Sequence, residues 1–228
     1  MRAIVLADGD APDRAALDRA WPGWDEAAEV VIAADGGARH AGQLGLTILS
    51  WVGDGDSIDS DDLAALAERG VTIRRVATAK DESDTELAVL EALAHEPDEI
   101  VIIGALGGVR IDHTIANIGL LAMPQLGDLP IALLDERARI RLIRAPGPAG
   151  VEVRFPLPGT EGDRVSLLPY GEGVAGVTTH GLAYPLADEP LPPGPARGLS
   201  NVRVSPDAAV TVRSGRLLVI ETPATLVR

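Results

Sequence analysis

The first two-thirds of the chain alternates short apolar runs with amphipathic stretches. Apolar runs that suit buried strands occupy residues 3–7, 30–34, 48–52, 71–76, 99–104 and 131–134. Between them, residues 61–70 and 84–96 carry apolar side chains three and four positions apart, the spacing of a helix that buries one face. This alternation predicts an α/β fold, in which a mostly parallel sheet carries helices on both faces.

The pattern changes near residue 145. Residues 145–150 (APGPAG) form a Pro/Gly-rich break, and no helical periodicity follows them. Short β-rich runs then occupy residues 151–155, 163–170, 209–213 and 216–220, and the Pro-rich stretch 184–201 reads as a long surface loop. We therefore expect two domains: residues 1–145, which are α/β, and residues 146–228, which form a small all-β sandwich or barrel.

Composition limits the classes of function. Hydrophobic residues make up 46% of the 228 positions, enough for a buried core, and the absence of cysteine excludes disulfides and Cys-type zinc sites. The formal net charge of -14 argues against a nucleic-acid or anionic-membrane partner, because such partners require a basic face. No apolar run is long enough to span a bilayer, and the N-terminal residues turn acidic too early for a signal peptide, so we expect a cytoplasmic protein. A nucleotide is still possible, since a divalent cation bridges carboxylates to phosphates.

Two loops rich in aspartate and glycine follow successive predicted strands. They are Asp35-Gly36-Gly37, after the run at 30–34, and Gly53-Asp54-Gly55-Asp56-Ser57, after the run at 48–52. Ligands of open α/β sheets bind beyond the carboxyl ends of the strands. If the second loop is extended, Asp54 and Asp56 project to the same side and suit Mg²⁺, which is commonly shared with substrate phosphates. Either loop alone is better explained as an ordinary turn, but two of them at the ends of successive predicted strands favour a site.

Lys80 is the only lysine of the chain, and it directly precedes the helical pattern at 84–96. Ser83 and Glu86 match a capping box, so helix capping explains the serine without any ligand. Capping does not explain the lysine, whose compact ammonium at a phosphate is not replaced by the planar fork of arginine. A structural and a phosphate-binding interpretation of this segment both remain open.

The segment from Gly104 to Asn117 predicts a strand that ends in a glycine-rich loop, followed by a helix for which Asp112 is a plausible cap. Such loops cradle phosphates at helix N-termini, although the P-loop pattern is missing here. Arg110, beside the glycines, is the better phosphate candidate. His113 shares a helix face with Asn117, and a single histidine at a helix start is more often structural than catalytic.

In this order the motifs resemble those of the thiamin pyrophosphokinase (thiamin diphosphokinase) family. The matching segments are residues 35–37, 53–57, 80–86, 107–117, 181–186 and 198–201. Each motif is weak alone, but the ordered set is specific and spans nearly the whole chain. Three positions depart from the family pattern: Val109 interrupts the usual Gly-Gly-Arg, Gly55 replaces a bulkier residue, and Tyr184 stands where several members have tryptophan.

The resemblance implies an N-terminal α/β nucleotide-binding catalytic domain and a C-terminal β-sandwich for thiamin binding and dimerisation. It also implies a homodimer with active sites at the subunit interface. The implied reaction is Mg²⁺-dependent transfer of the terminal diphosphate of ATP to the primary hydroxyl of thiamin, which yields thiamin diphosphate and AMP. The expected chemistry is in-line attack of the hydroxyl on the β-phosphorus.

Residue by residue, the resemblance implies four sets, some of which share residues. The expected metal ligands are Asp35, Asp54 and Asp56, and the expected catalytic residues are Asp54, Asp56 and Asp81. The expected nucleotide-site residues are Asp35, Gly36, Gly37, Lys80, Asp84, Arg110, Asp112, His113 and Asn117. The expected thiamin-site residues are Tyr184, Ser200 and Asn201.

Three alternative functions stay open at this level. One is a related diphosphokinase that acts on another alcohol, such as a pterin, since the motifs describe the nucleotide half better than the acceptor. Another is a non-catalytic nucleotide or thiamin sensor, although every acidic position expected from the resemblance is still acidic. A metal-dependent phosphohydrolase is the weakest alternative.

Overall fold

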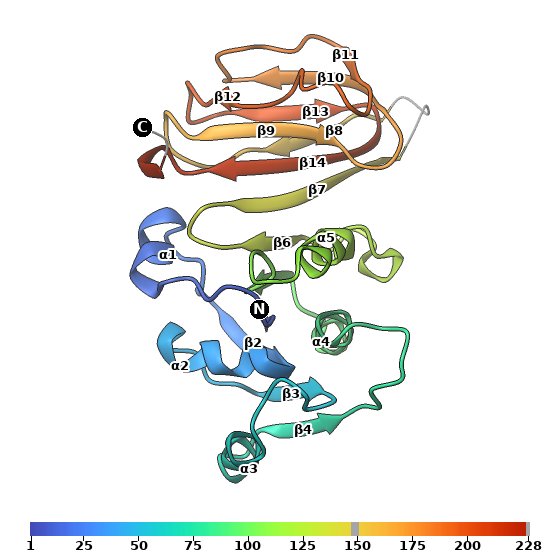
Figure 1. Ribbon diagram of the computed structural model, residues 1–228. Coiled ribbons are helices and arrows are strands. Elements are labelled where there is room, and N and C mark those ends of the chain that lie inside the picture. Colours follow the sequence, from blue (N-terminus) through green and yellow to red (C-terminus); the bar gives the residue numbers. More distant parts are fainter. Residues whose placement is uncertain (147–150, 227–228) are drawn as a thin grey trace. The chain divides into compact units, whose positions relative to one another are not determined.

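The chain divides into two compact units, Met1–Glu136 and Arg137–Arg228, in a computed structural model that describes residues 1–146 and 151–226 (Figure 1). The sequence placed the domain boundary after residue 145, whereas this division lies between Glu136 and Arg137. Strand β7 (Arg139–Pro146) belongs to the second unit because it pairs with β14 (Ser214–Thr222) along its length. Most of the Pro/Gly-rich break, residues 147–150, lies outside the described residues.

A parallel sheet forms the centre of the N-terminal unit, in the strand order β4-β3-β2-β1-β5-β6. Its strands are β1 (Arg2–Leu6), β2 (Ala28–Ala34), β3 (Ser50–Gly53), β4 (Thr72–Arg75), β5 (Glu99–Ile103) and β6 (Ile131–Leu134). Each lies within or beside an apolar run that predicted it. The burial of β1, β2 and β5 on both faces explains why these runs are continuous rather than alternating.

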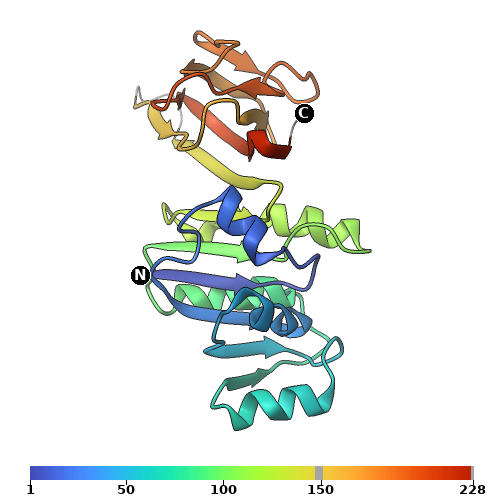
Figure 2. The same ribbon diagram turned by 90° about the vertical axis from the view of Figure 1, so that its left-hand side faces the viewer.

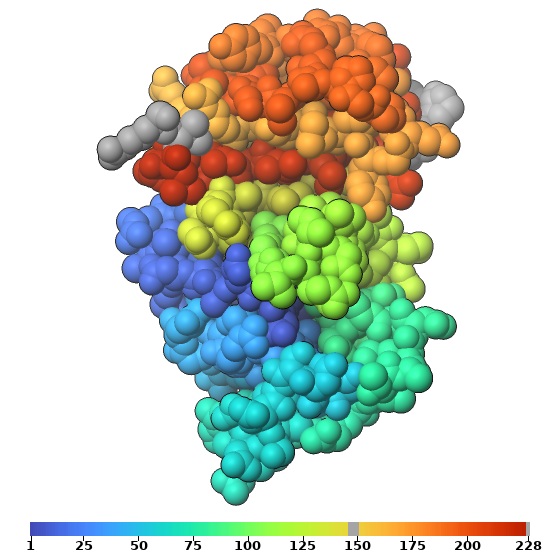
Figure 3. Space-filling view, in the orientation of Figure 1, coloured from blue at the N-terminus to red at the C-terminus, as the bar shows by residue number. Residues whose placement is uncertain are grey.

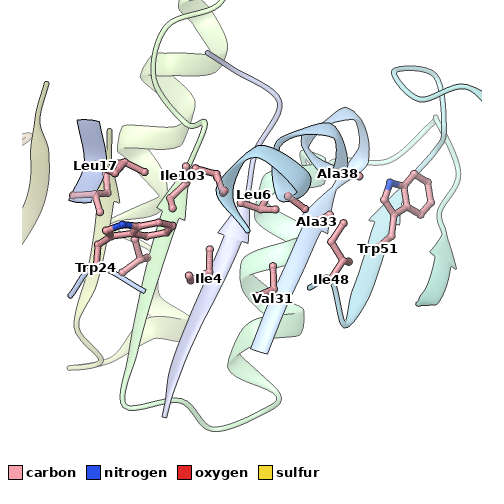
Figure 4. Close-up of a cluster of buried hydrophobic side chains, with 14 of the residues drawn as sticks. Ile4, Leu6, Leu17, Trp24, Val31, Ala33, Ala38, Ile48, Trp51 and Ile103 are labelled. Atoms are coloured by element: carbon pink, nitrogen blue, oxygen red, sulfur yellow. The ribbon is translucent and has the colours of Figure 1, made fainter. Parts of the chain in front are cut away.

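Helices cover both faces of this sheet, so the predicted α/β class is confirmed. One face packs against α1 (Arg14–Ala20), α2 (His40–Leu44) and α3 (Ser60–Glu68), and Figure 4 shows the apolar cluster there, with Leu17, Leu6 and Trp51 among its members. The other face packs against α4 (Asp84–Leu93), and α5 (Ile111–Leu120) lies beside α4. Figure 2 shows α2 and α4 on opposite sides of the strands.

The helix starts agree only partly with the expected caps. Ser83 caps α4 as predicted, since its hydroxyl accepts the N–H of Glu86 at 3.1 Å. The predicted cap of α5 is wrong, because Arg110 occupies the N-cap and Asp112 lies inside the first turn. Gly107 and Gly108 have left-handed backbone angles in the loop before α5, and the helix begins three residues later, at Ile111.

The C-terminal unit is an antiparallel β-sandwich, as expected. One layer contains β7, β14, β9 (Arg164–Pro169) and β12 (Asn201–Val202); the other contains β8 (Val153–Pro156), β13 (Ala209–Val212), β10 (Val174–His180) and β11 (Glu189–Leu191). Apolar side chains from both layers, such as Val165, Leu217 and Val177, form its core. The stretch 184–201 is not only loop, because β11 lies within it and pairs with β10.

Among the described residues, the helices are all too short or too polar to cross a membrane.

Candidate active site

The loops that follow the parallel strands meet at one edge of the sheet. Strands β1 to β4 are added in one direction and β5 and β6 in the other, so the strand order reverses beside β1. In α/β folds this is where ligands bind. A side chain at Gly9 would clash with the carbonyl of Gly104, and one at Gly37 with that of Leu6, so these loops pack backbone against backbone.

The glycines of the Asp35-Gly36-Gly37 motif have a packing role. Both are buried, and the space that a Cβ would need at Gly36 is filled by the carboxylate of Asp8. The family resemblance implies that both glycines belong to the nucleotide site, and that assignment stays a prediction. In the structure they let the turn after β2 lie against β1 and the loop that follows it.

Three carboxylates from distant parts of the chain converge at this edge. Asp35 follows β2, Asp54 follows β3, and Asp84 begins α4; one carboxylate oxygen of each lies within 4.8 Å of the others. We call these three residues the acidic trio. One oxygen of Asp35, Oδ1, is buried and has no hydrogen-bond partner among the described residues. Oxygen ligands of this kind suit a hard divalent cation such as Mg²⁺, which would satisfy the buried oxygen.

The backbone of Asp35 is held in an uncommon conformation. Its φ of 41° lies in the left-handed region, which residues other than glycine seldom adopt. The indole N–H of Trp51 donates to the Asp35 carbonyl at 2.9 Å, and the N–H of Ser57 donates to Asp35 Oδ2 at 3.3 Å. These bonds hold the carboxylate in place at a cost in backbone strain, a feature that clusters at functional sites.

Within the acidic trio, the pKa values of Asp35 and Asp54 are shifted in opposite directions. The pKa of Asp35 is raised to about 6, chiefly by burial and also by the neighbouring carboxylates of Asp56 and Asp84, against the hydrogen bond from Ser57. The pKa of Asp54 is lowered instead, chiefly by the hydrogen bond from the Asp56 N–H and also by the charge of Lys80. Asp35 therefore holds its proton to a higher pH than Asp54 does, and a cation bound there would favour its ionised form.

Asp56 does not lie where an extended loop would place it. Strand β3 ends at Gly53, Gly55 is left-handed with φ of 83°, and the Asp56 N–H turns back to Asp54 Oδ1 at 3.1 Å. The loop is therefore not extended as expected, so extended spacing does not bring Asp54 and Asp56 to one side. Asp84, which the sequence assigned to the nucleotide, takes the third place in the trio. Asp56 is exposed beside it and accepts the Ser57 hydroxyl at 2.8 Å.

Lys80 reaches the acidic trio. Its ammonium lies 3.1 Å from Asp84 Oδ1 and 3.9 Å from Asp54 Oδ2, and its side chain is mostly buried. The only lysine of the chain therefore stands where a phosphate bound at the trio would meet it. Asp81, one residue further along, is exposed and lies outside the trio.

The residues predicted around the loop after β5 separate into two groups. Arg110, Asp112 and His113 are exposed, and Arg110 pairs with Asp112 through bonds of 2.9 and 2.5 Å. This guanidinium lowers the pKa of Asp112 to about 2. Asn117 is buried and donates to the Ala105 carbonyl at 2.9 Å. Its amide therefore holds the loop after β5 in place. The sequence alone did not distinguish this structural role from contact with a ligand.

A further acidic loop was missed. Asp8, directly after β1, has its carboxylate against Gly36 and forms an ion pair of 2.5 Å with Arg39. Burial raises the pKa of Asp8; Arg39 opposes this, and the charges of Asp56 and Asp84 add to it. Asp8-Gly9-Asp10 follows a strand just as the other two Asp-Gly loops do, so the same signal was available.

In the C-terminal unit, the predicted thiamin-site residues lie together. The amide of buried Asn201 accepts the Tyr184 N–H at 2.9 Å and donates to the Tyr184 carbonyl at 2.6 Å. Asn201 is thus occupied in holding the backbone of the Tyr184 segment. Tyr184 is 62% exposed, and Ser200 is exposed beside Asn201 with a left-handed φ of 58°. These two side chains are therefore the ones available to a ligand.

Comparisons with known proteins point in one direction for both units. Residues 23–133 match the family model described as thiamin pyrophosphokinase, catalytic domain, and residues 151–219 match the vitamin B1 binding domain of the same family. The thiamine pyrophosphokinase of Bacillus subtilis (strain 168) is 28% identical over 190 residues, which cover 83% of this chain and 85% of the relative.

Solved structures of similar proteins share the fold over almost the whole chain. The crystal structure of thiamine pyrophosphokinase from Bacillus subtilis superposes with a TM-score of 0.82 at 24% identity, covering 98% of this chain and 99% of the other. A thiamin pyrophosphokinase family protein from Enterococcus faecalis gives 0.80 at 26% identity, with coverage of 97% and 99%.

Proposed function

The chain belongs to the thiamin pyrophosphokinase family, and we infer that it is an enzyme that transfers the diphosphate group of ATP to thiamin. The observation that carries this inference is the acidic trio with Lys80 beside it, in a chain whose two halves match the catalytic and vitamin B1 binding domains. A sensor has no need of such a carboxylate set. A pterin diphosphokinase has no need of a vitamin B1 binding domain.

Mg²⁺ fits the acidic trio, because the three residues offer hard oxygen ligands and one buried oxygen of Asp35 lacks a partner among the described residues. When bound there, the ion would neutralise phosphate charge and favour attack at phosphorus. We propose Asp35, Asp54 and Asp84 as its ligands.

The chain's own residues would orient the phosphates and handle the proton. The Lys80 ammonium donates to a phosphate oxygen and offsets the charge of the transferred group. The thiamin hydroxyl oxygen forms a bond to the β-phosphorus, the bond between that phosphorus and the AMP oxygen breaks, and the hydroxyl proton passes to a base. We propose Asp56 as that base, because it is exposed beside the trio and is not one of its members. Asp81, exposed and outside the trio, receives no role.

On the thiamin side, Tyr184 and Ser200 supply the exposed contacts, and Asn201 holds the backbone of Tyr184. A homodimer with active sites at the subunit interface and a cytoplasmic location remain predictions from the family resemblance.

Incubation of the protein with ATP, Mg²⁺ and thiamin is expected to yield thiamin diphosphate and AMP in equal amounts, and chelation of the metal is expected to stop the reaction. Chromatography of the products separates the alternatives. Release of inorganic phosphate without thiamin diphosphate would indicate a phosphohydrolase, and nucleotide binding without turnover would indicate a sensor. A hydroxymethylpterin offered in place of thiamin is the control acceptor and should remain unmodified.

Lys80→Arg is expected to lower kcat/KM for ATP by roughly tenfold to a hundredfold, although the charge is retained. The Lys80 ammonium is a compact charge that lies near both Asp54 and Asp84, and a planar guanidinium does not reproduce this placement. Steady-state kinetics at varied ATP would measure the loss. Arg19→Lys, the reverse exchange at an exposed site, is the matched control and should leave the kinetics unchanged. Equal kinetics for Lys80→Arg and the wild type would remove Lys80 from the mechanism.

A further inference from the structure

The C-terminal unit contains a fully buried arginine that the reaction described above does not use. Arg203 is 0% exposed, and a guanidinium is among the costliest groups to remove from water. Its counter-charges are Glu221 Oε1 at 3.2 Å and Asp163 Oδ2 at 3.7 Å, and the Pro158 carbonyl accepts from it at 3.4 Å. Nε and Nη1 have no hydrogen-bond partner among the described residues. Since apolar side chains often replace buried ion pairs without loss of stability, such an arginine requires a reason other than stability.

Arg203 lies in a segment, residues 201–204, that is hydrogen-bonded on both sides. On one side the Arg203 N–H donates to the Asp163 carbonyl at 2.9 Å, in line with the pairing of β12 and β9. On the other side Leu182 forms an antiparallel bridge with Arg203, and backbone hydrogen bonds of 2.8 and 2.9 Å join the same two segments. Residues 181–184 therefore depend on residues 201–204 for their pairing in this layer. We call residues 181–184 and 200–204 together the acceptor ribbon.

The side chain of Arg203 ties the acceptor ribbon to a strand that the backbone of the ribbon does not reach. Strand β9 lies between β12 and β14, so the backbone hydrogen bonds of β12 end at β9. Glu221 lies on β14, and its ion pair with Arg203 spans this gap at 3.2 Å. Segments at the edge of a sheet open readily when backbone bonds alone hold them. The buried ion pair opposes opening, because opening would separate the two charges.

Both exposed thiamin contacts lie on the acceptor ribbon, and the orange segments to which it belongs lie at the surface in Figure 3. Tyr184 is held through the amide of Asn201. Ser200 has a left-handed φ of 58°, a conformation that persists only where its surroundings fix it. The Ser200 N–H donates to Ser166 Oγ at 3.0 Å, which is one such restraint. Arg203, on the same segment, supplies another.

We propose that Arg203 is a positioning residue for thiamin binding. Its ion pair with Glu221 fixes the acceptor ribbon, so that Tyr184 and Ser200 are in place before thiamin arrives and binding does not have to order them. This inference rests on the proposed function, in which thiamin is the acceptor. Arg203 acts through the ribbon and touches no ligand, because it is fully buried.

Arg203→Met removes the charge and keeps an unbranched apolar side chain. The two carboxylates stay partnered: Glu221 keeps Arg139 at 2.9 Å and Arg141 at 2.8 Å, and Asp163 accepts two backbone N–H groups. The unit should therefore fold. KM for thiamin is expected to rise by about tenfold, with KM for ATP and kcat at saturating thiamin unchanged, because only the ordering of the thiamin contacts is lost. Steady-state kinetics at varied thiamin and at varied ATP would measure this split.

Arg154→Met is the matched control, because Arg154 is an exposed arginine on β8 of the same unit. It should behave as the wild type. Hydrogen exchange gives an independent readout: the N–H groups of Ala183 and Val204 donate within the ribbon and should exchange faster in Arg203→Met than in the other two proteins. A merely structural role would lower kcat through loss of folded protein and leave KM for thiamin at its wild-type value. That result would overturn the inference.

If Arg203→Met does not fold, as judged by circular dichroism, Arg203→Lys decides. Lysine keeps the charge, but its ammonium is a single point donor and does not meet Glu221 and Asp163 together as the guanidinium does. A higher KM for thiamin with unchanged KM for ATP supports the inference, and an unchanged KM for thiamin overturns it.

The outcome is separable from that of the proposed function. A wild-type protein that forms no thiamin diphosphate contradicts the function. In that case calorimetric titration with thiamin still tests the inference, since wild type and Arg154→Met should bind thiamin more tightly than Arg203→Met. Equal thiamin affinity in all three proteins, or no binding by any of them, would overturn it.

Discussion

Replacing Asp35 by asparagine is expected to lower the rate of thiamin diphosphate formation by about a hundredfold or more. The variant loses the buried carboxylate oxygen that lacks a partner among the described residues and that we assign to Mg²⁺. Asparagine keeps the size of the side chain and tolerates the left-handed φ of 41°. The carbonyl that accepts the Trp51 indole N–H is also retained. The fold should therefore survive, and the loss should appear in turnover.

The same substitution is expected to stabilise the protein in metal-free buffer above neutral pH. The pKa of Asp35 is raised from 3.8 to about 6 in the folded protein, so the folded state holds the proton more tightly than the unfolded state does. The associated stability is complete below the unfolded pKa and is lost as pH rises through about 6. Asparagine carries no such ionisation. The melting temperature of Asp35→Asn should exceed that of the wild type at about pH 8, and the difference should vanish towards about pH 4.

Asp128→Asn makes the same chemical change at an exposed position and should alter neither turnover nor this pH dependence. Added Mg²⁺ should raise the melting temperature of the wild type more than that of Asp35→Asn, because binding stabilises the folded state. Asp35 would be excluded as a metal ligand by near wild-type turnover in the variant. A melting temperature of the variant below that of the wild type at about pH 8 would contradict the expectation that ionised Asp35 destabilises the metal-free protein.

Glu221→Gln is expected to destabilise the C-terminal unit by about 3–5 kcal/mol. Glu221 is 1% exposed and receives Arg139 at 2.9 Å, Arg141 at 2.8 Å and Arg203 at 3.2 Å. Arg203 is itself fully buried, and Glu221 is its closest counter-charge. Removing the anion leaves the fully buried Arg203 with the more distant Asp163, at 3.7 Å, as its counter-charge, whereas glutamine preserves volume. Urea unfolding followed by circular dichroism would measure the difference in free energy.

Glu189→Gln is the matched control in the same unit. Glu189 makes two bonds of 2.9 Å to Arg197, but both side chains are substantially exposed, so the loss should stay below about 1 kcal/mol. Similar losses of unfolding free energy in the two variants would mean that burial does not determine how strongly the Glu221 network stabilises the unit. Because Arg203 lies two residues after Asn201, Glu221→Gln should also loosen the Tyr184 segment and raise KM for thiamin.

The chain's local patterns were enough to predict its classes of structure. Apolar runs and helical spacing located the strands of the parallel sheet, α3 and α4, and the Ser83 cap, because these depend on neighbours within a turn or a strand. Helices α1 and α2 went unpredicted; they have seven and five residues, which is too short to show a helical period. The sequence boundary followed the Pro/Gly-rich break, whereas β7 joins the second unit through its pairing with the distant strand β14.

Residue types and motif order located the candidate site, but tertiary structure decided which side chains meet. Asp35, Asp54 and Lys80 lie close together in the structure, and their roles stay predictions. Asp84, and not Asp56, is the third member of the trio. The chain turns at the left-handed Gly55, and the ends of β2 and β3 lie beside the start of α4. The amides of Asn117 and Asn201 are directed to backbone carbonyls, Ala105 and Tyr184, that only the folded chain brings to them. Periodicity and motif order are properties of the linear chain. Convergence of side chains depends on strand neighbours and on single backbone angles, which the linear chain does not display.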